Sequence, residues 1–209
     1  MRLFTYAGSA NGYKVELLLA LLGRRYERVE VSIFEGEGRT PAFLARNPVG
    51  SVPVLERDDG TNLPESNAIL WHLARGTPWL PAADEDRVIR WLMFEQSEVE
   101  PVIGSARFWL LTGRDEERAD ELTRRLGWAR RTLAVLDGVL ESSAFLVGAA
   151  PTIADVAVYG YVHVAPDAGL ALGPHVAAWC RRIEALPGYV TGPAPYDRHA
   201  HVPARDRSG

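Results

Sequence analysis

Apolar residues recur with two different spacings along the first part of the chain, one typical of strands and one typical of a helix. Residues 2–6 and 26–33 have the alternation and the β-branched side chains of short strands. Between them, apolar residues recur at helical spacing and end at a glycine that acts as a stop signal: Val15, Leu18, Leu19 and Leu22, followed by Gly23. A strand, a helix and a second strand in succession predict a βαβ unit.

The next segment adds shorter elements. We expect a short helix at 41–46, a strand entered through Pro53 and, after a polar turn and a brief further segment, a helix at 67–75. The order of elements is then β-α-β-α-β-β-α. That order predicts a small α/β sandwich with four strands.

After residue 76 the pattern becomes helical almost throughout. Two prolines and a polar cluster indicate a linker at 77–86, which separates a domain at 1–76 from a domain at 87–190. Helical periodicity then predicts four helices, at 88–111, 115–141, 152–164 and 173–186. The tail, 191–209, has no apolar period, so we expect loop or disorder there. The predicted fold class is an α/β domain followed by an all-α domain.

Composition and charge narrow the classes of function. The 209 residues include 23 basic and 27 acidic side chains, a net charge of −4, so we expect no basic surface for nucleic acid or an anionic membrane. The single cysteine cannot form an internal disulfide, and no cysteine or histidine spacing predicts a metal site. No apolar run has the length of a signal peptide or the ~18 residues of a membrane span. We therefore expect a soluble cytoplasmic protein.

Three separated motifs carry more specific information. They are SANGYKV at 9–15, then NPVGSVPVL at 47–55 leading to ESNAI at 65–69, and finally FLVG at 145–148 followed by TIAD at 152–155. Each motif is short, but in this order and at these separations they resemble the cytosolic glutathione transferase family over nearly the whole chain. The resemblance implies an N-terminal thioredoxin-like domain, a C-terminal helical bundle domain, glutathione as co-substrate without a metal, and a homodimer.

The second motif contains the residues expected to bind glutathione. Pro53 cannot donate a backbone hydrogen bond, so it is expected to begin its strand. In the family this proline is cis, and the resemblance implies that the main chain of Val52 pairs with the extended tripeptide; an ordinary trans turn is the alternative. Ser66 is predicted to cap the helix that follows, and the resemblance implies that Glu65 and Ser66 hold the γ-glutamyl end. A cap without any other role is the alternative.

Two positions near this motif concern the charge available for glutathione. Ser51 stands where many family members have Lys or Arg, so one positive contact is missing. Arg39 is the candidate for contacting the glycine carboxylate, with a solvated loop position as the alternative.

The turn after the first strand contains the candidate chemistry. The resemblance implies that the hydroxyl of Ser9 donates a hydrogen bond to the glutathione sulfur. Lowering a thiol pKa of about 8.5 by ~2 units requires ~2.7 kcal/mol, and one hydrogen bond to a charged acceptor contributes about 1.5–3 kcal/mol. The amide of Asn11 is the second candidate donor, and Tyr6 at the end of the strand is the third. Ordinary turn chemistry of the sequence GSANG is the alternative.

The second substrate is expected in the cleft between the domains. One stripe of the predicted long helix differs from its core-facing stripe: Trp91, Glu95, Glu98, Val102, Ser105 and Trp109. Together with Phe108 this stripe is predicted to line the cleft, and dimer contacts are the alternative. Cys180 is predicted to be buried and inert, and Thr152 with Asp155 is predicted to form a capping box with a purely structural role.

The resulting prediction is a glutathione transferase-like enzyme that activates the thiol for attack on small electrophiles or for reduction of peroxides or disulfides. One alternative is a glutathione-dependent isomerase, dehalogenase or ether-cleaving enzyme. Another is a non-catalytic glutathione-binding or protein-interaction module, because one fold hosts many functions. Ser9, Pro53 and the Glu65–Ser66 pair favour an enzyme, since a scaffold has no physical need for all of them.

Overall fold

The computed structural model describes residues 1–196 and contains one sheet of four short strands: β1 (Arg2–Thr5), β2 (Glu27–Glu30), β3 (Val54–Glu56) and β4 (Asn62–Pro64). The spatial order is β2-β1-β3-β4. Strand β1 runs parallel to β2 and antiparallel to β3, and β3 is antiparallel to β4. Helix α1 (Ala10–Leu21) joins the parallel pair, which confirms the predicted βαβ unit.

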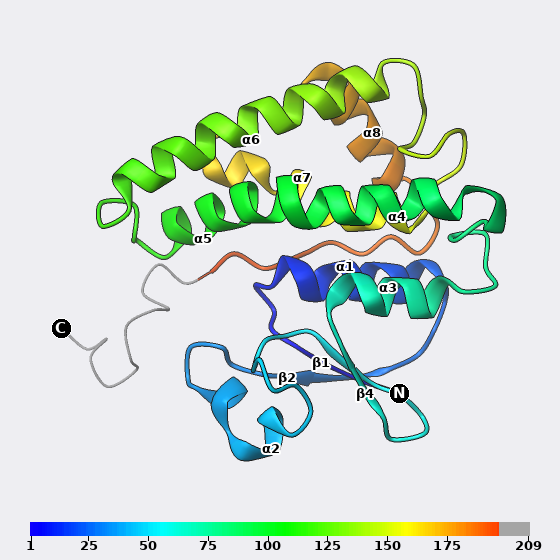
Figure 1. Ribbon diagram of the computed structural model, residues 1–209, viewed down its shortest axis with the longest axis vertical. Coiled ribbons are helices and arrows are strands. Elements are labelled where there is room, and N and C mark those ends of the chain that lie inside the picture. Colours follow the sequence, from blue (N-terminus) through cyan, green and yellow to red (C-terminus); the bar gives the residue numbers. More distant parts are fainter. Residues whose placement is uncertain (197–209) are drawn as a thin grey trace.

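Alternate residues of the strands pack into two different hydrophobic cores. Leu3 and Leu55 belong to the main core, which also includes α1 and α3 (Ser66–Ala74), whereas Phe4 and Val54 pack with Phe43 of α2 (Pro41–Leu44). Figure 1 shows α1 and α3 together on one side of the sheet and α2 on the other. This mixed sheet between helices is the predicted thioredoxin-like arrangement.

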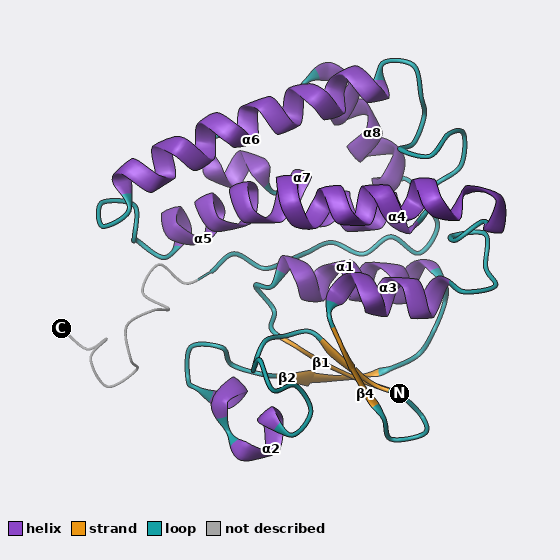
Figure 2. Ribbon diagram, in the orientation of Figure 1, coloured by secondary structure: helices purple, strands orange, loops and turns teal. Residues whose placement is uncertain are grey.

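The second part of the chain is built from helices, and the strands lie in the first part only (Figure 2). It begins with one continuous run: α4 (Glu85–Phe94), the π-helical segment η3 (Glu95–Gly104) and α5 (Ser105–Leu111). Then follow α6 (Ala119–Leu140), α7 (Ile153–Val162) and α8 (Pro174–Glu184). Short 3₁₀ turns are η1 (Glu37–Arg39), η2 (Ala82–Asp84) and η4 (Ala165–Ala168). Within residues 1–196, no helix combines the length and apolar character needed to cross a membrane.

Helix α7 lies at the centre of the molecule. All ten of its residues are buried, and it packs against α1 and α3 of the first domain and against α4 of the second. Its start is the predicted capping box: Thr152 accepts from the amide of Ala154, and the carboxylate of Asp155 accepts from the amide of Thr152. That carboxylate also accepts from the amide of Leu146 and the indole of Trp179, each at 2.9 Å. The motif therefore has the structural role expected of it.

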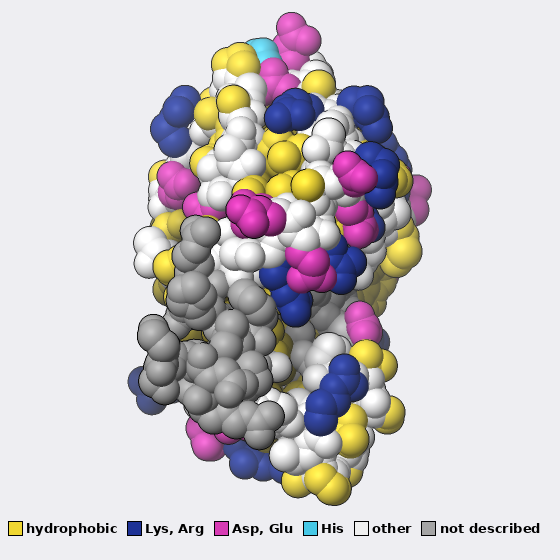
Figure 3. Space-filling model, turned by 90° about the vertical axis from the view of Figure 1, so that its left-hand side faces the viewer, with side chains coloured by type: hydrophobic (Ala, Val, Ile, Leu, Met, Phe, Trp, Pro, Cys, Tyr) yellow, Lys and Arg dark blue, Asp and Glu magenta, His cyan; other side chains and the backbone are white. Residues whose placement is uncertain are grey.

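The chain after α8 returns between the two domains (Figure 1). Residues 191–196 have no regular secondary structure, which agrees with the predicted loop. They are nevertheless held against the protein, because the amide of Ala194 donates to the carbonyl of Ala7 at 2.9 Å. The rest of the predicted tail, 197–209, lies outside the described residues. On the face drawn in Figure 3, Arg and Lys side chains are interspersed with Asp and Glu.

Cys180, on α8, is expected to resist alkylation in the folded protein. The side chain is buried, and burial raises the pKa of its thiol to about 12. At pH 8 the thiolate population is then about a thousandfold below that of an ordinary cysteine. Mass spectrometry after iodoacetamide treatment should show slow labelling of the native protein and complete labelling in denaturant. Rapid native labelling would contradict the assignment of an inert thiol.

Candidate active site

Ser9 is held at the start of α1 in a way that leaves its hydroxyl able to donate. Its Oγ accepts a hydrogen bond from the amide of Gly12 at 3.1 Å, which makes it the N-cap of the helix. No described residue accepts from the Ser9 hydroxyl. A glycine at position 12 has a local reason, since a Cβ there would lie 2.0 Å from Oγ1 of Thr5. The turn therefore presents one hydroxyl donor at the positive end of a helix.

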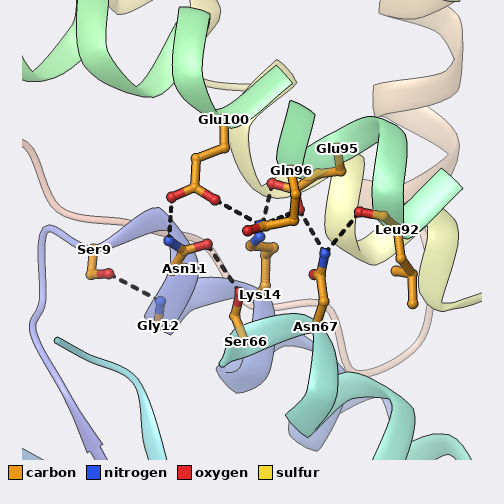
Figure 4. Close-up of polar contacts among 10 residues, drawn as sticks. All are labelled: Ser9, Asn11, Gly12, Lys14, Ser66, Asn67, Leu92, Glu95, Gln96 and Glu100. Carbon is orange, nitrogen blue, oxygen red and sulfur yellow. Dashed lines mark hydrogen bonds and ion pairs between the residues drawn. The ribbon is translucent and has the colours of Figure 1, made fainter. Parts of the chain in front are cut away.

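Asn11, the second candidate donor, is already bound on both sides of its amide (Figure 4). Its Oδ1 accepts from the hydroxyl of Ser66 at 3.0 Å, and its Nδ2 donates to Glu100 at 2.7 Å. These contacts hold α1, α3 and the π-helical segment together. Tyr6, the third candidate, packs its ring edge-on against Phe34 at 5.5 Å.

The prediction that Ser66 caps α3 is wrong. The residue before the helix is Glu65, at φ 71°, and no side chain in the described structure caps the helix start. Ser66 is instead the first helical residue, and its hydroxyl turns to Asn11. Glu65 is the one non-glycine residue with positive φ in the described chain, a conformation that is strained and is found preferentially at functional sites. The amides at the start of α3 are therefore without a side-chain cap.

The loop before β3 exposes main-chain hydrogen-bonding groups. The Val52–Pro53 peptide is cis, and β3 begins directly after Pro53. Among the described residues, neither the N–H nor the C=O of Val52 has a backbone partner. The amide side chain of Asn47 holds the loop by donating to the carbonyl of Ser51 at 2.8 Å and to its hydroxyl at 3.1 Å. An extended peptide could pair with Val52 by strand addition.

Two adjoining cavities share Ser51 and Val52. The first, of about 280 Å³, contains Ser9 and Arg39. The second, of about 160 Å³, contains Asn11, Glu65 and Ser66. The guanidinium of Arg39 donates to the carbonyl of Val49 at 2.8 Å, beside the first cavity. The structure therefore brings together the predicted residues of the first domain around one continuous surface.

A third and larger cavity, of about 500 Å³, lies between the domains and shares Gln96 and Glu100 with the second. Ser105, Phe108 and Trp109 line it, as the sequence predicts. Within residues 1–196, no three His, Cys, Asp or Glu side chains gather as a metal site requires.

Comparison with known proteins decides the family. Residues 1–75 match the family model "Glutathione S-transferase, N-terminal domain", and residues 99–187 match "Glutathione S-transferase, C-terminal domain". The chain is 30% identical to a maleylacetoacetate isomerase of Pseudomonas aeruginosa, over 87% of each protein. The chain belongs to the glutathione S-transferase family.

Solved structures of this family share the fold of this chain. A glutathione S-transferase from Pseudomonas fluorescens Pf-5 superimposes with a TM-score of 0.88 at 42% identity, covering 91% of this chain and 97% of that one. A glutathione transferase family member from Pseudomonas fluorescens Pf-5, solved with two glutathione molecules bound, gives 0.78 at 28% identity, with coverage of 90% and 89%. The fold of this family member is thus shared along most of its length.

Part of the predicted cleft stripe is wrong. Trp91 is buried and donates its indole N–H to the carbonyl of Leu146 at 3.0 Å, and Glu95 is fully buried. Glu98 accepts from the indole of Trp128 at 2.8 Å. The physical reason is that the buried face of this helical run is broader than the predicted core-facing stripe: Trp91, Glu95, Val99 and Val102 are all buried, at intervals of three or four residues. The residues that do turn to the cleft, Gln96 and Glu100, lie outside the predicted stripe.

The structure also contains a buried ion pair between the domains that the sequence does not predict. Lys14 of α1 donates to Glu95 at 2.9 Å, and both side chains are fully buried. The carboxylate of Glu95 further accepts from Asn67 and Gln96, each at 2.8 Å (Figure 4). The only signal in the sequence is that Lys14 is the single lysine among 23 basic residues. That count does not indicate a partner.

Proposed function

We propose that this chain is an enzyme that binds glutathione along Ser9, Val52 and the start of α3, and activates its thiol. The observation that carries the proposal is the hydrogen bonding of the Ser9 hydroxyl. Its oxygen accepts from the amide of Gly12, and no described residue accepts from its O–H, which lies in the same cavity as Val52. A thiolate is the acceptor that gains most from such a bond, because hydrogen bonds to charged groups are the strong ones. The glutathione-bound relative from Pseudomonas fluorescens supports this choice of ligand.

The remaining residues fit the other parts of the tripeptide. The uncapped start of α3 suits the α-carboxylate of the γ-glutamyl group, and Glu65 suits its ammonium. Arg39 is the cation beside the other cavity, where it suits the glycine carboxylate. Ser51 supplies a hydroxyl and no charge. Val52 pairs with the cysteinyl backbone by strand addition.

The reaction follows from the activated sulfur. The thiol proton leaves to solvent and the Ser9 hydroxyl stabilises the thiolate. The sulfur then attacks an electrophilic carbon, from which a leaving group departs with its electron pair, or it attacks a peroxide oxygen or a disulfide sulfur and breaks the O–O or S–S bond, so that the other half leaves as an alkoxide or a thiolate. Isomerisation is the second candidate, because the chain is 30% identical to maleylacetoacetate isomerase and a thiolate can add reversibly to a conjugated double bond.

We place the enzyme in the cytoplasm as a homodimer. Ile89 and Met93, one turn apart on α4, expose 39% and 61% of their surface and suit an interface.

Ultraviolet difference titration of bound glutathione is the experiment that tests this function. The thiolate absorbs where the thiol does not, so the spectrum reports the pKa of the bound sulfur. We expect a pKa about 2 units below the free value of about 8.5. Glutathione that binds with an ordinary thiol pKa and no turnover would instead indicate a binding module, and absence of binding would overturn the proposal.

A further inference from the structure

The first domain has a small pocket at the end of α1 and α3 that lies away from the Ser9 turn. The pocket has a volume of about 140 Å³, and its lining includes Arg24, Leu55, Arg57, Asp58, His72 and Leu73. Arg24 follows the C-terminal end of α1, and His72 lies in the last turn of α3. Because α1 has 12 residues, this end lies about 18 Å along the helix from Ser9. Figure 1 shows the N-terminus, which borders the pocket, at the far end of the sheet from the start of α1.

Three basic side chains of this pocket have no partner in the described part of the chain. Arg24, Arg57 and His72 are partly buried, and none of these side chains forms a hydrogen bond or an ion pair with residues 1–196. By contrast, Arg46, just after α2, donates to the carbonyl of Ala42 at 2.7 Å. The Nε of Arg57 is itself buried and unpaired. Buried donors in native proteins are nearly always paired, so this group favours an acceptor from outside the chain.

The charges around the pocket give it a positive field. Burial is the largest influence on the His72 imidazole and lowers its pKa below the ordinary value. Three guanidinium groups lower it further: Arg57, Arg75 and Arg24. An imidazole that is harder to protonate because of nearby cations lies where an anion is favoured.

The two carboxylates beside the pocket are already engaged. Asp58 is 85% exposed and accepts from the N-terminal ammonium of Met1 at 2.5 Å. Asp59 accepts from the amide of Thr61 at 2.9 Å and from its hydroxyl at 2.6 Å. Neither carboxylate pairs with a guanidinium of the pocket, so the positive charge there is left for a ligand.

Stabilisation of helix ends is the rival explanation for these cations, since α1 and α3 both end here and a helix C-terminus is partly negative. Arg57 does not fit that explanation, because it follows β3 rather than a helix. Nor does α1 need the guanidinium of Arg24 as a cap. Its last carbonyls accept from main-chain amides, those of Gly23 and Arg24, each at 2.9 Å.

We propose that this pocket binds a small tetrahedral dianion, either phosphate or the phosphoryl group of a small phosphate ester. The guanidinium groups of Arg24 and Arg57 supply planar pairs of donors that match phosphate oxygens, and the imidazole of His72 adds another donor. The volume is below the roughly 300–1,000 Å³ of pockets for drug-sized ligands, which favours a small anion over a nucleotide. The apolar side chains of Leu55 and Leu73 suit the short carbon part of an ester.

Titration with inorganic phosphate at constant ionic strength, followed by NMR of the His72 ring, tests the proposal; His72→Asn identifies the signal. We expect a saturable shift, and we expect Arg24→Gln and Arg57→Gln each to raise the Kd about tenfold. Arg25→Gln is the matched control, because Arg25 is exposed and next in the chain but does not line the pocket. Its Kd should stay within about twofold of the original. A shift that does not saturate, or an Arg25→Gln effect equal to that of Arg24→Gln, would show general attraction to positive charge and overturn the proposal.

The pKa of His72 is a second readout, which a purely structural role of the arginines would not change. Sulfate remains a dianion wherever histidines titrate, and we expect it to raise this pKa by about 1. In Arg57→Gln the pKa should rise without sulfate, because one of the charges that lower it is gone, and sulfate should then add little. A pKa that sulfate leaves unchanged would contradict an anion beside His72. If Arg57→Gln fails to fold, Arg24→Gln provides the same comparison.

A further titration distinguishes the two sources of the phosphoryl group. Ethyl phosphate that binds more tightly than inorganic phosphate would assign the pocket to an ester, and the reverse order would assign it to the free ion. None of these measurements uses glutathione, and none of the residues of the pocket belongs to the Ser9 site. Failure of this inference therefore leaves the proposed function untouched, and failure of the proposed function leaves this inference standing.

Discussion

Replacing Ser9 with alanine is expected to lower kcat/KM for glutathione transfer by about 10- to 100-fold and to return the bound thiol pKa towards about 8.5. The reason is that no described residue accepts from this hydroxyl, while its oxygen is fixed by the amide of Gly12. A fixed donor needs no reorganisation when the sulfur becomes charged. Steady-state kinetics and the difference titration measure the two effects independently.

The same substitution removes a helix cap, so its effect on folding must be separated from its effect on chemistry. Losing an N-cap costs about 0.5–2 kcal/mol of stability. Thr40→Ala is the matched control, because Thr40 caps α2 by accepting from the amide of Phe43 and lines none of the three cavities. We expect this control to lose stability and keep its activity.

Asn11→Ala separates the two candidate donors. Both hydrogen-bonding ends of the Asn11 amide are engaged, with Ser66 and with Glu100, so its removal should raise the KM for glutathione more than it lowers kcat. A bound-thiol pKa that stays low in Ser9→Ala and rises in Asn11→Ala would reverse the assignment.

The sequence predicts more of the fold than of the site. Strand alternation, helical spacing and turn residues are local signals, and they predict the βαβ unit and the order of elements. The SANGYKV and NPVGSVPVL motifs also indicate the neighbourhood of Ser9 and Val52, because each motif is one short contiguous segment. Contacts that join distant segments leave no such local signal. The bond from Asn11 to Glu100 spans 89 residues and the contact of Arg107 with Ala194 spans 87.

Two features could not be predicted from the sequence, for more specific physical reasons. The buried face of the run from α4 to α5 includes Glu95, a charged side chain whose partner Lys14 lies in the other domain, so an apolar pattern does not reveal how broad that face is. Residues 191–196 lack an apolar period because they form no helix or strand, so their attachments depend on carbonyl and amide groups that every sequence has. A pattern of side chains cannot predict contacts made by the main chain. Both features concern the helical side of the site, where the substrate other than glutathione is expected.

Replacing Lys14 with methionine is expected to destabilise the protein by about 3–5 kcal/mol, because it leaves a buried carboxylate without its cation. Lys14 and Glu95 are both fully buried, 2.9 Å apart. The room for Lys14 is built into α7, where a Cβ on Gly160 would lie 2.4 Å from the Lys14 side chain. Asn67 and Gln96 also donate to Glu95, but neutral amides do not balance its charge. Urea denaturation followed by circular dichroism measures the loss.

A double-mutant cycle shows whether the loss belongs to the pair. Glu95→Gln alone should also be strongly destabilising, since it leaves the ammonium buried and unpaired, whereas Lys14→Met combined with Glu95→Gln should cost less than the sum of the two. The exposed pair of Arg87 with Asp84, at 2.7 Å, is the control, and Arg87→Ala should cost about 0–1 kcal/mol. Additive losses at Lys14 and Glu95 would contradict direct coupling. Because the pair joins α1 to the π-helical segment that carries Glu100, coupled loss would also show that the Asn11 side of the glutathione site depends on contact between the domains.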